Sequence, residues 1–567
     1  MSPRDAAIRT DGTAPPANEP VEADEASGQK QAAAPAPPAF VPRPPLLTAG
    51  YMIASAIVAL TQGLGLSFIS TNLQQISGPM QITQNEAAWL MAAYLFPNVS
   101  LSLLLFKLRT QYGIRNFCEV AIVAYVLVCI AHLYAEGYQS ALILRFFAGV
   151  AAAPMSSIAF LYMLEPVPPQ RKLNIGLCLA LTALALPTPV AGLISPTLLD
   201  IGGYHALYVV EMGLAMISLG LIYLLPLASP PRVKVISVLD VVTYCFLAVA
   251  MGCLAIVLVV GRIYWWTSAA WLGWLIAGSI VAAMVVALIE LNRTNHLLDI
   301  RWLTSREIIH FTGALLVFRI ILSEQSSGAI NFLRAMGLQN EQLAGLYWVI
   351  LGASVVSGLI CAAIMKPGRE PAIHAVSLLL LAVGSYMDSH ATALTRPEQM
   401  YLSQLLIGFA GGLFLPPALA VGLTAALKRG PNYILSFIIV FLTTQKIGGF
   451  LGSAVIGTFV RWREQFHSFR LVSRLTTADP LVAARLRQLG GAYGKILTDS
   501  HQQTVQGAQL LARQVTQQAY VLAYNDAFLL TACLALFALI FLIVHVAWRN
   551  RRDWASKSSP LTGTSTA

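Results

Sequence analysis

An arginine and a glutamate lie in the middle of one apolar stretch. Residues 308–333 read IIHFTGALLVFRIILSEQSSGAINFL, with Arg319 and Glu324 near the centre. About 20 apolar residues at about 1.5 Å rise each cross the hydrocarbon layer of a membrane. A charge at that depth costs at least about 2.5–3.5 kcal/mol, so it is normally paired or faces a cavity. The stretch indicates ion or proton chemistry inside a membrane. The alternative is that both side chains extend to the membrane surface and place their charges in water.

Four further carboxylates in apolar stretches differ in their depth. Glu119, Asp240 and Glu290 are close to the ends of their stretches and are expected to be solvated or structural. Glu211 is about two turns inside its stretch. A carboxyl group isolated from water holds a proton and releases it when water or a cation approaches. Glu324 and Glu211 are therefore the candidates for binding a transported proton, with Arg145 as a cation that could promote release.

The other polar residues in apolar stretches predict the charge of a central cavity. The cations Arg145, Arg319 and Lys446 outnumber the two deep acids, and Gln62, Asn98 and Gln404 could donate hydrogen bonds. A net positive cavity suits anionic or weakly acidic amphiphiles such as aromatic acids. The nine histidines are dispersed and the seven cysteines have no CxxC spacing, so no metal site is expected.

The composition is that of a multi-pass membrane protein. Of 567 residues 57% are hydrophobic and 11% are charged, and the net charge of +10 comes mostly from short loops rather than from a nucleic-acid-binding face. Lysine and arginine are concentrated in alternate loops, which predicts that both termini are cytoplasmic. We count fourteen apolar spans: 46–70, 86–106, 117–135, 139–164, 173–199, 205–228, 236–261, 268–291, 308–333, 342–365, 372–390, 399–427, 433–460 and 524–548.

Two polar segments and one repeat complete the organisation. Residues 1–45 are rich in Ala and Pro, which predicts a disordered tail. Residues 461–523 are expected to form a helical hairpin on the outer side, with Asp479-Pro480 starting one helix, although a solvated loop is the alternative. The triplet Gln-Asn-Glu occurs at 84–86 and at 339–341, just after the first and ninth spans, and suggests two equivalent halves.

Several motifs together resemble the fourteen-helix drug:proton antiporter branch of the major facilitator superfamily, in particular its EmrB-type permeases. Four of them are short stretches: RFFAG at 145–149, TPVAG at 188–192, QKIGGFLGS at 445–453 and ARQVTQQAYVLAYNDAF at 512–528. The second stretch belongs to a helix kinked by prolines, with Pro187, Pro189 and Gly192 as its motif residues. The second span adds Trp89, Tyr94 and Asn98. The resemblance covers about 46–550. It implies an all-α membrane protein with two six-helix bundles and two inserted helices. The residues expected to line the substrate cavity are Arg319, Lys446, Gln62, Trp89, Tyr94, Asn98 and Gln404.

The chain departs from the family at two places. Only Gly113 and Arg115 remain of the family's motif in the loop after the second helix. The family's first helix usually carries a proton-binding Asp, where this chain has Gly65. Matching the two Gln-Asn-Glu triplets sets Gly65 against Ile320, one turn from Glu324. Glu324 is therefore our first choice for the proton-binding carboxyl and Glu211 the second.

The expected regions follow from the spans and the resemblance: a cytoplasmic tail (1–45), an N-terminal bundle (46–230), two inserted helices (235–295), a C-terminal bundle (305–550) containing the hairpin (461–523), and a cytoplasmic tail (551–567). The expected function is proton-driven efflux of multiple drugs or toxic compounds, amphiphilic small molecules that include weakly acidic aromatic ones, through a bacterial inner membrane. No enzymatic activity and no cofactor besides the proton gradient are expected. The resemblance implies a periplasmic adaptor and an outer-membrane channel as partners, and nucleic acid is not expected. The alternative is an exporter of one metabolite or siderophore with atypical or no proton coupling.

Overall fold

The computed structural model describes residues 42–228, 232–293, 296–429, 431–476 and 478–558, and these are almost entirely helical, with no strand among them. Ten helices or continuous helix runs in this part of the chain are long and apolar enough to cross a membrane. The prediction of an all-α membrane protein is confirmed. Every one of the fourteen expected spans coincides with a helix, but the number of membrane crossings stays a prediction. Most of the tails expected at 1–45 and 551–567 lies outside the described residues.

The N-terminal bundle contains six long helical paths. Its elements are α1 (Pro45–Thr71), α2 (Leu73–Ser77), α3 (Gln84–Leu101), α4 (Leu105–Tyr112), α5 (Ile114–His132), α6 (Tyr138–Leu164), α7 (Pro169–Arg171), η1 (Lys172–Gly176), α8 (Leu177–Ala185) and α9 (Pro187–Leu224). The long element α9 comprises part of the fifth expected span and most of the sixth. Gly202 and Gly203 interrupt it with non-helical backbone, and Gly203 has φ of 57°, a conformation that glycine adopts without steric cost.

The second half of the chain begins with two inserted helices, α10 (Val238–Tyr264) and α11 (Ala270–Leu291). The C-terminal bundle follows. Its elements are α12 (Ile300–Leu303), α13 (Arg306–Ser323), η2 (Glu324–Ala329), α14 (Ile330–Ala335), α15 (Ala344–Ile364), α16 (Glu370–Asp388), η3 (Pro397–Met400), α17 (Tyr401–Arg429), α18 (Pro431–Val472), α19 (Pro480–Gly491) and α20 (Ser500–Ser558). The element η2 is a π-helical insertion in the ninth expected span, and such insertions are frequent at functional sites.

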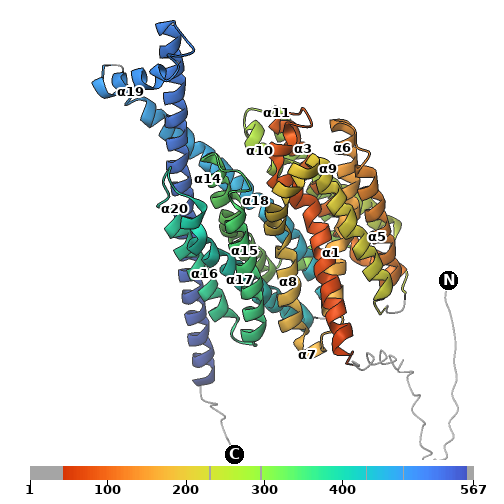
Figure 1. The fold of residues 1–567 in the computed structure, drawn as a ribbon. Coiled ribbons are helices and arrows are strands. Elements are labelled where there is room, and N and C mark those ends of the chain that lie inside the picture. Colours follow the sequence, from red (N-terminus) through yellow and green to blue (C-terminus); the bar gives the residue numbers. More distant parts are fainter. Residues whose placement is uncertain (1–41, 229–231, 294–295, 430, 477, 559–567) are drawn as a thin grey trace, which may run out of the picture. The chain divides into compact units, whose positions relative to one another are not determined.

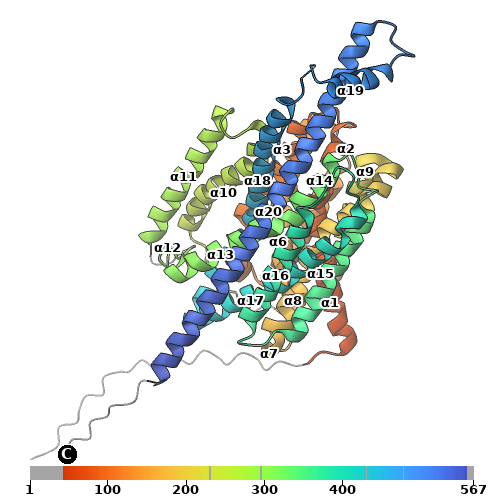
Figure 2. The same ribbon diagram turned by 90° about the vertical axis from the view of Figure 1, so that its left-hand side faces the viewer.

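The described residues of the expected hairpin (461–523) belong mainly to three helical segments. The end of α18, the helix α19 and the start of α20 lie at the end of the bundle opposite to the start of α1 and the end of α20 (Figures 1 and 2). Asp479 caps α19 by accepting a hydrogen bond from the amide of Leu481, as its position before Pro480 indicates. A side chain on Gly507 would lie 2.6 Å from the carbonyl oxygen of Leu486, so a glycine is needed where α19 crosses α20. We call this end of the bundle the hairpin side and the other the termini side.

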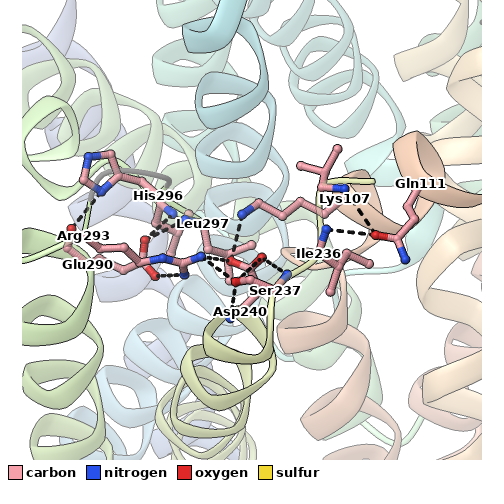
Figure 3. Close-up of polar contacts among 11 residues, drawn as sticks. Lys107, Gln111, Ile236, Ser237, Asp240, Glu290, Arg293, His296 and Leu297 are labelled. Carbon is pink, nitrogen blue, oxygen red and sulfur yellow. Dashed lines mark hydrogen bonds and ion pairs between the residues drawn. The ribbon is translucent and has the colours of Figure 1, made fainter. Parts of the chain in front are cut away.

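A buried ionic network joins the inserted helices to the N-terminal bundle (Figure 3). Lys107 Nζ of α4 lies 2.8 Å from Asp240 Oδ1 of α10, and Arg293 Nη2 lies 2.7 Å from the same oxygen. Arg293 also pairs with Glu290 at the end of α11, at 3.1 Å. Asp240 and Glu290 are completely buried. These two acids were expected to be either solvated or structural, and the structure gives them a structural role. Lys107 and Arg293, which lie in expected loops, pair with them in the interior.

Replacing Lys107 by alanine is expected to destabilise the protein by about 3 kcal/mol. Breaking a buried ion pair costs about 3–5 kcal/mol, and Arg293 still compensates Asp240. Unfolding of purified protein in mixed micelles measures the loss. The matched control is Arg115→Ala, which removes a more exposed pair with Glu119 in the next helix and should change stability little. Equal stability of the two variants would contradict a structural role for the network.

Candidate functional site

A cavity of about 280 Å³ lies between the two bundles. Its walls come from α8 and α9 of the first bundle and from α13, η2, α15, α17 and α18 of the second. Leu181, Leu184, Ile350 and Leu415 form apolar parts of the wall, whereas Ser323, Ser326, Ser354, Thr182, Thr188 and Gln325 supply hydroxyl and amide groups. A cavity with mainly apolar walls and a few polar groups is typical of small-molecule sites.

Arg319 is the charged residue in the wall of this cavity. No hydrogen bond or ion pair of its side chain occurs within the described part of the chain, and its buried Nε has no partner. Gly448 and Gly449 of α18 leave room for it, since a side chain at Gly449 would lie 2.7 Å from Arg319 Nη2. No aspartate or glutamate lines the cavity. A guanidinium group in this setting can bind a carboxylate with two parallel hydrogen bonds.

Glu324 faces away from this cavity and lies against a second carboxyl group. Gln404 Nε2 is 3.2 Å from Glu324 Oε1 and 2.7 Å from Asp388 Oδ2, so one amide group joins the two acids. The Ser403 hydroxyl donates a short hydrogen bond to Asp388. Glu324 and Asp388 are 1% and 4% exposed, and neither forms an ion pair with any described residue. Two adjacent buried carboxyls cannot both carry a charge without a large cost, so the pair is suited to hold a proton.

Asp388 is the residue that the sequence reasoning missed. It is the last residue of α16, near the end of the expected span 372–390, and by sequence alone an acid at that place resembles an ordinary helix-end residue. Gln404, predicted to line the substrate cavity, instead lies in the first turn of α17 between the two carboxyls. A signal was present in the sequence, since an acid and a glutamine at the facing ends of consecutive spans can meet in an antiparallel helix pair.

Glu211 lies beside Gly65, where the first helix lacks the family's acid. Tyr125 donates a hydrogen bond of 2.7 Å to Glu211 Oε1. A Cβ atom at Gly65 would be 2.6 Å from the same oxygen and 3.0 Å from the tyrosine hydroxyl. The Glu211 carboxyl of α9 therefore occupies the space that a side chain at position 65 of α1 would enter. Gly65 makes room for it because glycine has no Cβ atom.

Arg145 contacts residue 65 as well. Its Nη2 donates to the carbonyl oxygen of Gly65 at 2.5 Å, and its guanidinium group lies 4.8 Å from the ring centre of Tyr94. Its Nε and Nη1 are buried without hydrogen-bond partners, although Glu211 is close enough to interact with it electrostatically. Arg145 and Glu211 form no direct ion pair, so the N-terminal bundle holds a buried acid and a buried base on either side of Gly65.

Most of the other predicted cavity residues lie elsewhere, which corrects that part of the prediction. Lys446 donates to Asn98 Oδ1 at 2.8 Å and to Ser102 at 2.7 Å, linking α18 with α3. Trp89 donates to Tyr264 of an inserted helix at 3.3 Å. The Gln62 carbonyl oxygen accepts a bond of 3.3 Å from Tyr94. These contacts join helices, that of Gln62 through its backbone carbonyl, and only Arg319 of the seven predicted residues lines the cavity.

The kinked helix with the predicted antiporter motif forms one wall. Pro189 lines the cavity, and Pro187 packs against Gly63 of α1. Gly192 has Tyr347 of α15 directly against its Cα, so a side chain there would overlap the tyrosine ring. Gly192 therefore allows the close contact between the two bundles, whereas Pro187 packs within the N-terminal bundle.

The hairpin side of the cavity is closed by contacts between the bundles. Arg334 Nη2 lies 3.4 Å from the Tyr347 hydroxyl and 2.7 Å from the carbonyl oxygen of Thr71, the last residue of α1. Asn340 donates to Asn72 Oδ1 at 2.8 Å. We call Arg334, Asn340, Thr71 and Asn72 the hairpin-side gate.

The described residues contain no group of three or more His, Cys, Asp or Glu side chains able to hold a metal ion.

Known proteins similar to this chain are membrane transporters, and one solved transporter shares its fold. No protein-family model matches the chain. It is 21% identical over 500 residues to the colistin resistance protein EmrB of Acinetobacter baumannii, covering 85% of this chain and 93% of that protein. The human organic anion transporter MFSD10 (TETRAN) has a similar structure, with a TM-score of 0.53 and 11% identity over 87% of this chain and 100% of that one. The major facilitator superfamily proton:xylose symporter XylE matches with a TM-score of 0.49 and 14% identity. The match covers 88% of this chain and 95% of that one.

Proposed function

We propose that this multi-pass membrane protein, which has the major facilitator fold and resembles EmrB-type permeases, is a proton-driven efflux permease for weakly acidic amphiphilic small molecules. The observation that carries the proposal is the cavity between the two bundles, with Arg319 as an unpaired cation in its wall. Its place is the bacterial inner membrane, with both termini in the cytoplasm and the hairpin side facing the periplasm.

The substrate class follows from the charge and size of the cavity. Arg319 offers several N–H donors to an anionic group, and no wall residue offers a competing carboxylate. The leucine and isoleucine side chains opposite would contact an apolar or aromatic body. At about 280 Å³ the space fits a small aromatic acid better than a large amphiphile.

Proton coupling is assigned first to Glu324 with Asp388, and second to Glu211. The carboxyl pair lies near the hairpin-side ends of α16 and α17, which supports proton uptake from the periplasmic side. Transport results if the proton and the substrate stabilise opposite-facing states of the same cavity, so that the binding of one shifts the population away from the state that binds the other. The contact of Gln325 with the carbonyl oxygen of Gln404, at 3.1 Å, connects the carboxyl pair to the cavity wall.

Uptake of 1-naphthoate into inverted membrane vesicles tests the proposal. With an acidic interior, a weak acid is excluded by passive distribution, so accumulation requires the carrier. We expect accumulation by the wild type, and for Arg319→Gln a rise in KM of about tenfold or more, because a charge-assisted hydrogen bond contributes about 1.5–3 kcal/mol.

Two controls separate binding from folding in this test. Arg319→Lys should retain part of the affinity, since it keeps the charge but not the paired donors. Arg396→Gln removes an equal charge from an exposed loop and should leave uptake unchanged. Absence of any gradient-dependent naphthoate uptake by correctly folded wild type, with uptake of one particular metabolite or siderophore instead, would favour the alternative of a dedicated exporter.

The hairpin is the proposed contact for a periplasmic adaptor, which would connect the permease to an outer-membrane channel. It presents large apolar side chains to solvent: Phe469, Leu481 and Ile496 are 76%, 80% and 79% exposed. Exposed apolar groups gathered on one projecting segment are typical of protein-interaction surfaces.

Deleting residues 470–510 is expected to abolish export across the cell envelope while uptake into inverted vesicles persists. A milder variant replaces two of the exposed residues, Leu481→Ser with Ile496→Ser. It should weaken export without altering the packing of α19 on α20. Export is measured as naphthoate released by intact cells. Unchanged export in both variants would rule out a role for the hairpin, and loss of vesicle uptake as well would indicate misfolding.

A further inference from the structure

A second cavity, of about 680 Å³, lies on the hairpin side of the gate. Its wall includes the end of α1, the short α2 and the start of α3 from the N-terminal bundle, and parts of α14, α18 and α20 from the C-terminal bundle. The inserted helix α10 closes it with Arg262. We call this space the outer vestibule. Arg334 separates it from the central cavity, because it lines the vestibule and contacts Tyr347, which lines the central cavity.

The outer vestibule carries three arginines and no acidic residue in its wall. Arg262, Arg334 and Arg461 all line it. Glu464 interacts electrostatically with Arg461 but does not line the space, and Glu86 is held by the hydroxyl of Thr83 in a helix cap. The vestibule therefore has a strongly positive wall, which attracts anions.

Arg262 is the arginine whose donors are free to bind an anion. Arg334 donates to Thr71 and Asn340, and Arg461 Nη1 donates to the carbonyl oxygen of Arg262 at 2.9 Å. For the Arg262 guanidinium no hydrogen bond or ion pair exists within the described ranges. Gly457 makes room for it, since a side chain there would lie 2.8 Å from Arg262 Nη1. The guanidinium group thus retains its full set of N–H donors beside the vestibule.

The two Gln-Asn repeats of the sequence meet in this vestibule. Gln84 and Asn85 line it from the N-terminal bundle, and Gln339 and Asn340 line it from the C-terminal one. Tyr520 and Tyr524 of α20 add phenol groups. The amide of Asn340 is used in the gate, but the other amide and phenol groups can donate hydrogen bonds without adding charge, so the wall surrounds the arginines with further donors for an oxyanion.

We propose that the outer vestibule is a second anion-binding site, centred on Arg262, which holds the carboxylate of a substrate after it has passed the gate. This inference deepens the proposed function, because the same chemical group would be bound in turn by Arg319 and by Arg262. The direction of passage rests on the proposed function, whereas the existence of the site does not.

Equilibrium dialysis of labelled 1-naphthoate against purified full-length protein in dodecyl maltoside tests the proposal. The wild type should show two classes of site. Arg262→Gln should weaken one class about tenfold or more, and Arg319→Gln should weaken the other. Arg396→Gln is the control of equal charge on an exposed loop and should keep both classes. The proposal is overturned if Arg262→Gln keeps both classes of naphthoate-binding site unchanged. It is also overturned if the wild type shows a single class of site and Arg319→Gln abolishes it.

A second arm of the experiment distinguishes substrate from lipid, since a lipid phosphate could bind the same arginines. Phosphatidylglycerol is added to the micelles and its binding is measured in the wild type and in Arg262→Gln. Naphthoate binding that depends on Arg262, with or without competition by the lipid, supports the proposal. Lipid binding that depends on Arg262 while naphthoate binding does not would overturn it. If the site is found but wild-type vesicles show no naphthoate uptake, the proposed function fails and the anion site stands.

Discussion

Glu324→Gln is expected to abolish the accumulation of naphthoate under a pH gradient while leaving gradient-independent exchange intact. The glutamine can keep the contact with Gln404 but cannot bind and release a proton, so substrate movement continues without being driven. Asp388→Asn should have the same effect, because the two carboxyls share one amide donor and act as one proton site. Uptake into inverted vesicles measures the driven step, and counterflow of labelled against unlabelled naphthoate measures the exchange.

The matched control for these variants is Glu119→Gln. Glu119 lies near the end of its helix and is paired with Arg115 at 2.8 Å, so its loss should leave both accumulation and exchange unchanged. If Glu324→Gln and Asp388→Asn both accumulate naphthoate as the wild type does, the carboxyl pair is not the coupling site. Loss of exchange together with accumulation would show that the pair is needed for substrate movement itself.

The second large effect concerns Gly65 and Glu211. Gly65→Asp alone is expected to eliminate transport, because its Cβ would be 2.6 Å from Glu211 Oε1 and would bring a second carboxyl into the same space. Glu211→Ala alone should strongly reduce transport if this carboxyl is needed for coupling. The double variant Gly65→Asp with Glu211→Ala should be more active than either single one, since the space is vacated and a carboxyl is returned to it from α1.

Gly65→Asn with Glu211→Ala is the control for the double variant. Asparagine matches aspartate in size but does not titrate, so this pair should fold as well and remain uncoupled in vesicle uptake. Equal activity of the Asp and Asn double variants would mean that only the packing beside Tyr125 matters. Full activity of Glu211→Ala would exclude Glu211 from coupling and leave the assignment to Glu324 and Asp388.

The sequence alone determined the class of protein and the approximate position of its helices. Apolar runs of about 20 residues separated by short charged loops leave few alternatives to membrane helices, because in lipid every backbone polar group needs an internal partner. Local chemistry was also readable. Asp479 before Pro480 starts α19, and Gly149 allows α6 to approach α3, since a side chain there would overlap the backbone at Tyr94.

Only the tertiary structure decided which polar groups meet, since helical spacing gives the direction of a side chain but not its neighbour. Glu324 and Arg319 are five residues apart, yet one faces Asp388 and the other a cavity. Lys446 and Asn98 were expected in that cavity but bind each other across the bundles. The carboxylate of Glu211 reaches Gly65 from a helix more than a hundred residues away, which depends on how α9 packs against α1. Packing of distant helices, rather than local pattern, fixed the candidate site.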